Sequence, residues 1–317
     1  MKSLKDILAG IEILESTEDL AIQIRGIQFD SRKVKPGDLF VAVKGTHVDG
    51  HQFIAKAVEQ GAAAVVCEIL PEAIPSGLVV VRIEQTQVNF GKMAAAYYNH
   101  PSANLKVVGV TGTNGKTTIA TLLYKTFSLL GYKVGLISTI KYYVGHDEFP
   151  ATHTTPDALQ IQELMAKMVD AGCEYCFMEV SSHAIDQDRI SGIEFNGGIF
   201  TNLTHDHLDY HLTFAEYLKA KKKFFDNLPG TAFALTNADD KNGMVMLQNT
   251  SALKQTYSLR TLANFHCKIL EKHFDGMLLS IDGQEVWTHF TGVFNASNLL
   301  AVAGATLLLG VDRNELL

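Results

Sequence analysis

The sequence predicts an α/β protein with two domains, a small N-terminal α/β domain and a larger one built on a doubly wound, mostly parallel sheet. Three observations predict this fold class. The 317 residues are too many for one ordinary domain and suit two. From Leu105 onward, apolar strand-like runs alternate with helix-like segments, as in doubly wound sheets. Pro101, Ser102 and Asn104 interrupt the chain just before this alternation, so we place the domain boundary between residues 1–101 and 102–317.

The predicted N-terminal domain begins with an amphipathic helix over residues 1–15, whose acidic residues distinguish it from a signal peptide. A turn signal at residues 34–38 and Gly61, placed after a helical segment, separate the elements that follow. The expected strands cover 22–24, 26–29, 39–43, 62–68 and 77–81, and the expected helices cover 53–60 and 87–98.

The predicted larger domain has polar residues where its strands end. Its expected strands cover 107–110, 134–139, 175–180, 197–201, 231–236, 268–270 and 277–281, and its expected helices cover 119–130, 158–171, 214–225 and 295–309. Ligands of doubly wound sheets bind at the carboxyl ends of the strands, so these ends predict where a site lies. The polar residues at the strand ends are Thr111, Thr139, Glu179, Asn202 and Asn237.

The first strand of the larger domain, Val107-Val108-Gly109-Val110, runs into a glycine-rich turn and a Lys-Thr pair. The run shows no alternation of apolar and polar residues, as expected of a central strand buried on both faces. Gly112 and Gly115 allow the backbone N–H groups of the turn to surround an anion. Lys116 adds a positive charge, and the hydroxyl of Thr117 is a ligand that Mg²⁺ accepts.

This turn departs from the general phosphate-loop pattern, G-x-x-x-x-G-K-[ST], because Val110 stands where the first glycine belongs. The alternative interpretation is a glycine-rich turn that binds nothing. We favour the phosphate loop, because a strand, a turn and a helix follow one another in the order that such a loop requires.

The composition argues against several classes of partner. The formal net charge of −7 and a pI near 5.9 exclude a generic nucleic-acid or membrane-surface binder. No apolar run approaches the ~18 residues that a membrane span needs, so we expect a soluble, cytoplasmic protein. The sequence has four cysteines, of which Cys67 and Cys267 are isolated, and we expect the pair Cys173 and Cys176 to be structural. A zinc site would need a second ligand pair, and cytosolic chains rarely hold disulfides.

Three further features bear on chemistry. Glu179 closes an apolar strand, where a carboxylate needs a partner such as Mg²⁺ or, alternatively, a nearby Lys or Arg. Residues 204–211, THDHLDYH, suit a transition metal or contacts with Mg²⁺ and phosphate, and their spacing does not decide between these. Lys221 belongs to a basic helix whose other lysines fit a solvated face, and periodicity does not separate Lys221 from them.

Six motifs follow one another along the chain: GVTGTNGKTT, MEVSSHAIDQDRI, FTNLTHDHLDYH, EYLKAKKKFF, TNADD and FNASN. Together they resemble the successive motifs of the Mur ligases, ATP-dependent amide-bond ligases of peptidoglycan precursor synthesis. The N-terminal DSRKVKPGDLFVAVKGTHVDGHQF is similar to the UDP-binding domain of the MurE type. The resemblance covers about residues 22 to 310. EVSSHA with Gln187 and Arg189 favours MurE over relatives such as MurF or folylpolyglutamate synthetase.

The resemblance implies roles for individual residues. Those implied in ATP binding are Gly112, Thr113, Asn114, Gly115, Lys116, Thr117, Thr118, Asn295 and Asn298. Those implied in Mg²⁺ binding are Thr117, Glu179 and His207, while Lys221 matches a lysine that CO₂ converts to a carbamate in the family. Those implied at the uridine diphosphate end of the substrate are Ser31, Thr46, His47 and Val48. Those implied at its muramoyl-peptide end are Thr154, Thr155, Ser181, Gln187 and Arg189. The implied catalytic residues are Lys116, Lys221, Glu179 and His207.

The resemblance also implies a reaction and its partners. The MurE type adds a third residue, meso-diaminopimelate or L-lysine, to UDP-N-acetylmuramoyl-L-alanyl-D-glutamate through an acyl phosphate, with ATP and Mg²⁺ as cofactors. We expect a monomer with no nucleic-acid or membrane partner. Family members continue into a third, Rossmann-like domain that binds the incoming amino acid. We expect that domain to be absent here, which would leave these residues unable to complete ligation alone.

Two other interpretations come from different functional classes. One is a module that binds a nucleotide or a UDP-sugar and catalyses nothing; activity restored by a supplied third domain would contradict it. The other is a P-loop GTPase or kinase. We disfavour it because the sequence has no N-K-x-D guanine signature.

Overall fold

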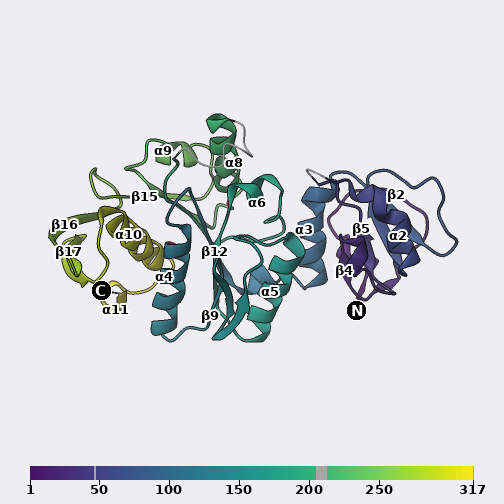
Figure 1. Ribbon diagram of the computed structural model, residues 1–317, viewed down its shortest axis with the longest axis horizontal. Helices are drawn as coiled ribbons and strands as arrows, with labels where there is room; N and C mark the ends of the chain where they lie inside the picture. Colours follow the sequence, from purple (N-terminus) through teal and green to yellow (C-terminus); the bar gives the residue numbers. More distant parts are fainter. Residues whose placement is uncertain (46–47, 205–212, 317) are drawn as a thin grey trace. The chain divides into compact units, whose positions relative to one another are not determined.

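The computed structural model describes residues 1–45, 48–204 and 213–316. Within them the chain forms two compact units (Figure 1). The first unit comprises Met1–Pro101, Pro156–Ala166 and Gln187–Ile193, and the second comprises Ser102–Thr155, Lys167–Asp186 and Glu194–Leu317. Two short segments from beyond residue 101 therefore group with the first unit. The functional division into residues 1–101 and 102–317 stays a prediction.

The first unit is built on a five-stranded sheet in the order β2-β7-β6-β5-β4. The pairs from β7 to β4 are parallel, and β2 runs antiparallel to β7. The strands are β2 Ile13–Ser16, β4 Ile27–Gln28, β5 Leu39–Val41, β6 Ala64–Cys67 and β7 Val79–Ile83, with a separate pair of β1 Lys2–Ser3 and β3 Gln23–Ile24. The helices are α1 Leu4–Ile7, η1 Ser31–Lys33, η2 Gly50–Phe53, α2 Ile54–Glu59 and α3 Thr86–Tyr97.

Strand β5 shows that this sheet is covered on both faces. Leu39 and Val41 pack into one apolar cluster with residues of α1 and α3. Phe40, between them, packs into a second cluster with Ala57 of α2. Successive side chains of a strand point to opposite faces, so a strand covered on both faces needs a continuous apolar run. The predicted buried strand is confirmed, although it ends at Val41 rather than Val43.

The N-terminal segment corrects the single helix predicted over residues 1–15. It forms β1, the four-residue helix α1 and then β2. Gly10 adopts a φ of +76°, the left-handed conformation in which helices commonly end. Ile13 then pairs with Ile83 of β7. This pairing within the sheet outweighs the local helical pattern of the segment.

The second unit is built on an eleven-stranded sheet in the order β11-β10-β9-β12-β8-β13-β14-β15-β16-β17-β18. The strands from β9 to β16 in this order are parallel, and antiparallel hairpins extend both edges. The predicted doubly wound sheet is confirmed, because later strands add on both sides of β8. The bounds are β8 Lys106–Thr111, β9 Val134–Ile137, β10 Lys141–Val144, β11 Asp147–Pro150, β12 Tyr175–Glu179, β13 Gly197–Phe200, β14 Phe233–Asn237, β15 Leu253–Ser258, β16 Phe265–His273, β17 Gly276–Ile281 and β18 Gln284–Thr288.

Helices cover both faces of this sheet (Figure 1). Helices of the second unit include α4 Lys116–Leu129, α6 Ser182–Asp186, α8 Phe214–Asp226, α9 Gly243–Met246, α10 Val293–Leu308 and α11 Arg313–Leu316. Helix α5 Ala158–Asp170 begins among residues of the first unit and ends among residues of the second. Val134 and Leu136 of β9 belong to the cluster that contains α4 and α10. Gly135, between them, faces the opposite side, where a Cβ would lie 2.2 Å from the sulfur of Met168 in α5. Every helix in the described part of the chain is too short or too polar to cross a membrane.

The hairpin of β10 and β11 was not anticipated from the sequence. Its buried side chains, Tyr142 and Val144, alternate with half-buried ones. An alternation of four residues is too short to identify a strand, and β11 is mostly exposed. The strand predicted over residues 134–139 therefore ends earlier, at Ile137, and the chain turns back beside it.

All four cysteines are buried and free. Burial raises the pKa of the Cys67 thiol to about 11 and that of the Cys267 thiol to about 11. It also raises the pKa of Cys173 and Cys176. Raising a thiol pKa lowers the fraction of reactive thiolate at neutral pH, and burial blocks access to it. The structure thus agrees with the predicted structural role of Cys173 and Cys176.

We expect the four thiols to resist a disulfide reagent such as DTNB at pH 8 while the chain is folded, and to react after unfolding in guanidinium chloride. Absorbance of the released thiolate measures both. Fast labelling of one or more thiols in the folded chain would contradict the burial of these side chains.

Candidate active site

The turn after β8 has the backbone geometry of a phosphate loop. Gly112 has a φ of +147°, and Gly115, the residue before α4, has a φ of +89°. A Cβ at Gly112 would lie 1.9 Å from the hydroxyl oxygen of Thr201, so no other residue fits there. Since the order of the sheet reverses at β8, the turn lies where doubly wound folds bind ligands. The helix that follows offers its N-terminus to an anion.

The end of the neighbouring strand β13 holds this turn in place. The N–H of Thr113 donates to the carbonyl of Asn202 at 2.8 Å. The N–H of Asn114 donates to the side-chain oxygen of Asn202 at 3.0 Å. The hydroxyl of Thr201 donates to the carbonyl of Asn114 at 2.6 Å. The polar end of β13, expected only to border a site, is therefore what fixes the phosphate loop.

Two lysine side chains meet at the carbonyl of Gly112. Lys116 Nζ donates to it at 3.0 Å and to the carbonyl of Thr113 at 2.8 Å. Lys221 Nζ, from α8, donates to the same Gly112 oxygen at 3.0 Å. The positive charge predicted for the loop from Lys116 is thus joined by a second one from a distant part of the sequence.

Burial separates Lys221 from the other lysines of its helix, which periodicity did not do. Lys221 is 1% exposed, whereas Lys219 and Lys223 are exposed. Lys222 is paired with Asp226 one turn further along. The interpretation of a solvated face therefore holds for Lys219 and Lys223 and is wrong for Lys221. A fully buried lysine is rare unless it has a specific partner.

Tyr217, one turn before Lys221, joins α8 to the phosphate loop. Its ring centre lies 4.7 Å from Lys221 Nζ. Its hydroxyl oxygen is 3.1 Å from that of Thr113, which also accepts the N–H of Thr204 at 3.0 Å. Tyr217 was not predicted as a site residue, although its position four residues before Lys221 places both on one face of the helix.

Glu179 is fully buried at the end of β12. Its carboxylate accepts the N–H of Thr139 at 2.7 Å and the Thr139 hydroxyl at 3.2 Å. That hydroxyl also lies 3.1 Å from the hydroxyl of Thr154. Among the described residues, no Lys or Arg forms an ion pair with Glu179, so the alternative of a basic partner finds no support there. Thr139, predicted only as a polar strand end, connects Glu179 to a predicted substrate residue.

Thr155 and Ser181 form hydrogen bonds with the backbone close to Glu179. The Thr155 hydroxyl donates to the carbonyl of Glu179 at 2.8 Å and accepts the N–H of Ser181 at 3.0 Å. The Ser181 hydroxyl accepts the N–H of Ala184 at 3.2 Å and so caps α6. Thr154, Thr155 and Ser181 are therefore gathered around the end of β12.

The remaining predicted residues of the first unit that the structure describes are Ser31, Val48, Gln187 and Arg189. Gln187 accepts hydrogen bonds from Arg189 Nε and Nη2 at 2.9 and 2.6 Å. Ser31 is 5% exposed at the start of η1, where Asp30 caps the turn. Val48 is 52% exposed. The predicted residues that lie outside the described part of the chain are Thr46, His47 and His207, with most of the 204–211 cluster.

Asn298 lies against the phosphate loop from α10. A Cβ at Gly115 would be 2.7 Å from its side-chain oxygen, and Asn298 is 8% exposed. Asn295, one turn earlier, donates its side-chain N–H to the carbonyl of Thr291 at 2.8 Å. The two residues of the FNASN motif therefore have different surroundings, and Asn298 is the one packed on the loop.

Oxygen atoms of the kind that hard cations prefer lie near this loop. Glu179 offers a buried carboxylate, and Thr117 offers a half-buried hydroxyl in the first turn of α4. The hydroxyl of Thr111, at the end of β8, is fully buried, and within the described chain it has no hydrogen-bond partner. No group of three His, Cys, Asp or Glu gathers among the residues in the described ranges.

Comparison with protein families identifies the chain. The Mur ligase middle domain matches residues 110–306, which is more than half of the chain. The chain belongs to the Mur ligase family. A second match, to the catalytic domain of that family, covers residues 23–111. The predicted resemblance is confirmed, and the P-loop GTPase or kinase is contradicted.

Named relatives and a solved structure place the chain near the MurE type. UDP-N-acetylmuramoyl-L-alanyl-D-glutamate–2,6-diaminopimelate ligase of Phocaeicola vulgatus is 56% identical over 99% of this chain and 65% of its own length. The ligase of the same name from Parabacteroides distasonis is 57% identical over the same shares. A solved ligase of that name is 27% identical, with a TM-score of 0.84 over 99% of this chain and 65% of its own.

A more distant Mur ligase shows the same fold with a nucleotide. MurF of Thermotoga maritima, solved in complex with ADP, is 20% identical, with a TM-score of 0.59 over 95% of this chain. At that identity the likeness concerns the fold alone. The chain spans about two thirds, 65%, of the length of the curated relatives that it matches.

The contact of Asn298 with the loop predicts unequal effects of two glycine substitutions. Gly115 and Gly131 have φ values of +89° and +90°, but a Cβ at Gly131 would meet no atom within 4 Å. Gly131→Ala should lower the free energy of unfolding by about 1 kcal/mol, from backbone strain alone. Gly115→Ala should cost about 0.5–1.5 kcal/mol more, because the end of the Asn298 side chain must leave its rotamer to make room for Cβ. Urea denaturation measures both.

Asn298→Ala provides the control for this comparison. Added to Gly115→Ala, it should recover most of the extra loss, because the oxygen that Cβ meets is removed. Equal losses for the two glycine variants would show that Asn298 does not pack on the loop.

Proposed function

We propose that the chain carries the UDP-substrate and ATP-binding parts of an ATP-dependent ligase that joins 2,6-diaminopimelate to UDP-N-acetylmuramoyl-L-alanyl-D-glutamate. The observation that carries the proposal is that relatives named for this activity are 50–57% identical over 99% of the chain. The site geometry supports it, since a phosphate loop, a buried carboxylate and a buried lysine come together within one unit.

The chemistry proceeds in two steps. The terminal carboxylate of the UDP-linked dipeptide attacks the γ-phosphorus of ATP, and the bond from that phosphorus to ADP breaks, which gives an acyl phosphate. The amine then attacks the acyl carbon, phosphate leaves, and the nitrogen loses a proton as the amide forms. The phosphate loop positions the nucleotide, and Lys116, held at the loop, neutralises charge on the transferred group.

Mg²⁺ fits the oxygen ligands described above. Glu179 and Thr117 would hold it in this part of the chain, with His207 outside the described residues. Bound there, the cation would supply positive charge that offsets the negative charge of the phosphate groups. Thr139 orients the carboxylate of Glu179 through two hydrogen bonds. This is the kind of support that metal ligands commonly receive.

We also propose that Lys221 is carbamylated. The ammonium group of Lys221 would first lose one proton. The resulting neutral amine would attack CO₂, form an N–C bond and release a second proton, so that a cation becomes a carbamate anion. The burial of Lys221 beside Gly112 supports this role. A lysine with no role in the site would be expected to extend into solvent. The carbamate would supply further oxygen atoms for the cation.

Carbamylation predicts a ¹³C signal from one lysine. In ¹³C-bicarbonate at pH 8, NMR of the folded chain should show a carbamate resonance that Lys221→Ala abolishes. Lys219→Ala, at an exposed position of the same helix, should retain it. A spectrum without such a resonance, or one that Lys221→Ala leaves intact, would show that Lys221 remains an amine.

Substrate titration tests the proposed function directly. UDP-N-acetylmuramoyl-L-Ala-D-Glu should bind the chain at least about tenfold more tightly than UDP-N-acetylmuramoyl-L-Ala, because the added carboxylates gain charge-assisted hydrogen bonds. Isothermal calorimetry measures both. Equal affinity would contradict selection of the dipeptide. No binding of either compound by a folded sample would contradict the proposed UDP-substrate role.

A further inference from the structure

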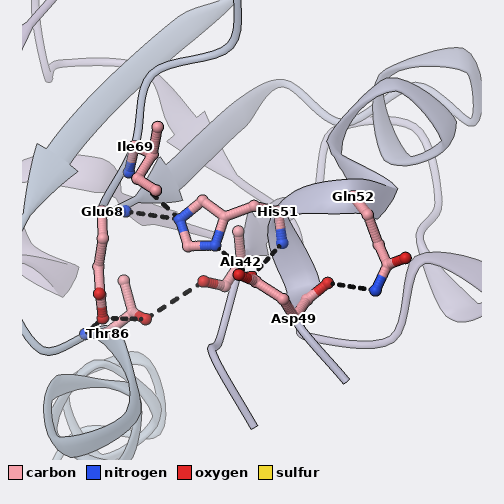
Figure 2. A network of polar contacts seen from close by, with 7 residues as sticks. All are labelled: Ala42, Asp49, His51, Gln52, Glu68, Ile69 and Thr86. Carbon is pink, nitrogen blue, oxygen red and sulfur yellow. Dashed lines mark hydrogen bonds and ion pairs between the residues drawn. The ribbon is translucent and has the colours of Figure 1, made fainter. Parts of the chain in front are cut away.

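His51 occupies the centre of a polar network in the first unit. Figure 2 shows its ring between Asp49 and the backbone of Glu68 and Ile69. His51 Nδ1 lies 2.6 Å from a carboxylate oxygen of Asp49. His51 Nε2 accepts the N–H of Glu68 at 2.9 Å and that of Ile69 at 3.3 Å. The side chain of His51 is 13% exposed.

These contacts fix which nitrogen of the ring carries the proton. A backbone N–H can only donate, so Nε2 must present its lone pair to Glu68 and Ile69. The proton then resides on Nδ1 and is donated to Asp49. Hydrogen bonds from the backbone N–H and the ring of His51 hold the pKa of Asp49 below its usual range, so this carboxylate is charged. Nδ1 therefore has one partner, Asp49, and Nε2 has two, the backbone N–H groups of Glu68 and Ile69.

The network continues through the starts and ends of three elements. Glu68, just after β6, accepts the N–H of Thr86 at 2.7 Å and its hydroxyl at 2.9 Å. Thr86 is the first residue of α3, and its hydroxyl also lies 3.2 Å from the carbonyl of Ala42, just after β5. The carboxyl ends of two parallel strands are thus tied together, and ligands of such sheets bind at these ends.

Two short segments between β5 and His51 flank residues 46 and 47, and backbone contacts join them: the first arm, Lys44 and Gly45, and the second arm, Val48 and Asp49. Lys44 and Asp49 form an isolated antiparallel bridge. The N–H of Gly45 donates to the carbonyl of Val48 at 3.0 Å. Asp49 also caps η2 through the N–H of His51 at 3.0 Å. His51 therefore holds the second arm, Val48 and Asp49, through two hydrogen bonds to the same carboxylate oxygen of Asp49, one from its backbone N–H and one from its ring.

We propose that His51 is a positioning residue for the UDP-linked substrate. It joins the arm of Val48 and Asp49 to the end of β6 and so sets where Val48, a predicted contact of the uridine end, is presented. His51 acts through this arm and does not touch the substrate. The inference rests on the proposed function, since it assumes that the first unit binds the UDP-linked substrate.

Two substitutions of His51 test its two ring nitrogens separately. His51→Asn can still donate to Asp49 but is too short to accept from Glu68 and Ile69. His51→Gln can still accept from those two amides but has no donor at the Nδ1 position. Either change breaks the link between the arm and β6. His100→Asn, at an exposed position of the same unit, is the matched control.

Calorimetry with UDP-N-acetylmuramoyl-L-Ala-D-Glu and with ADP gives the test. Both His51 variants should bind the UDP-linked substrate about tenfold more weakly, as expected for one lost hydrogen bond, and should bind ADP as the unaltered chain does. The His100 variant should match the unaltered chain for both ligands. A loss of structure throughout the first unit would also weaken substrate binding, but it would remove the hydrogen-exchange protection of Val79–Ile83 as well.

Hydrogen exchange without ligand shows whether the arm has been released. His51→Asn should speed exchange at Glu68 and Ile69, and His51→Gln should preserve their protection. Protection across Val79–Ile83 should persist in both variants, which shows that the unit is folded. Unchanged affinity of both variants for the substrate would overturn this inference and leave the proposed function intact. Absence of binding by the unaltered chain would overturn both.

Discussion

The second unit depends on one crowded peptide, that of Gly112. Its Cα has no room for a side chain because Thr201 lies against it, and its carbonyl accepts hydrogen bonds from Lys116 and Lys221. The phosphate loop, α4, α8 and the end of β13 therefore converge on one backbone group. Backbone held by several elements at once is pre-organised, and such rigidity is what positioning a phosphate group requires.

Two ionisable side chains of the site are buried, and burial of an ionised group costs free energy. Glu179 is fully buried, and Lys221 is 1% exposed. The hydrogen bonds described for them go to Thr139 and to the backbone of Gly112. Burying the carboxylate of Glu179 costs free energy that hydrogen bonds from the neutral Thr139 offset only in part. A site that binds phosphates and a cation would regain that cost when its ligands arrive, which is consistent with the proposed ligase chemistry.

Both units use the same topological feature. Parallel strands carry their polar residues beyond their carboxyl ends, so these residues meet at one edge of each sheet. In the first unit, β5 and β6 lead to Ala42 and Glu68, which the His51 network connects. In the second, β8, β12 and β13 lead to the phosphate loop, Glu179 and Asn202. Each parallel sheet thereby gathers polar residues at one edge from segments that are far apart in the sequence.

The sequence by itself determined the sheet type, the phosphate loop and the family, because apolar runs, glycines and motif order are local properties of the chain. It also placed Thr139 and Asn202 at strand ends, although not their partners. Only the tertiary structure decided that Lys221 is buried, that Thr139 holds Glu179 and that the first fifteen residues are not one helix. Burial and hydrogen-bond partners depend on which distant segments pack together, and periodicity within one segment carries no record of that.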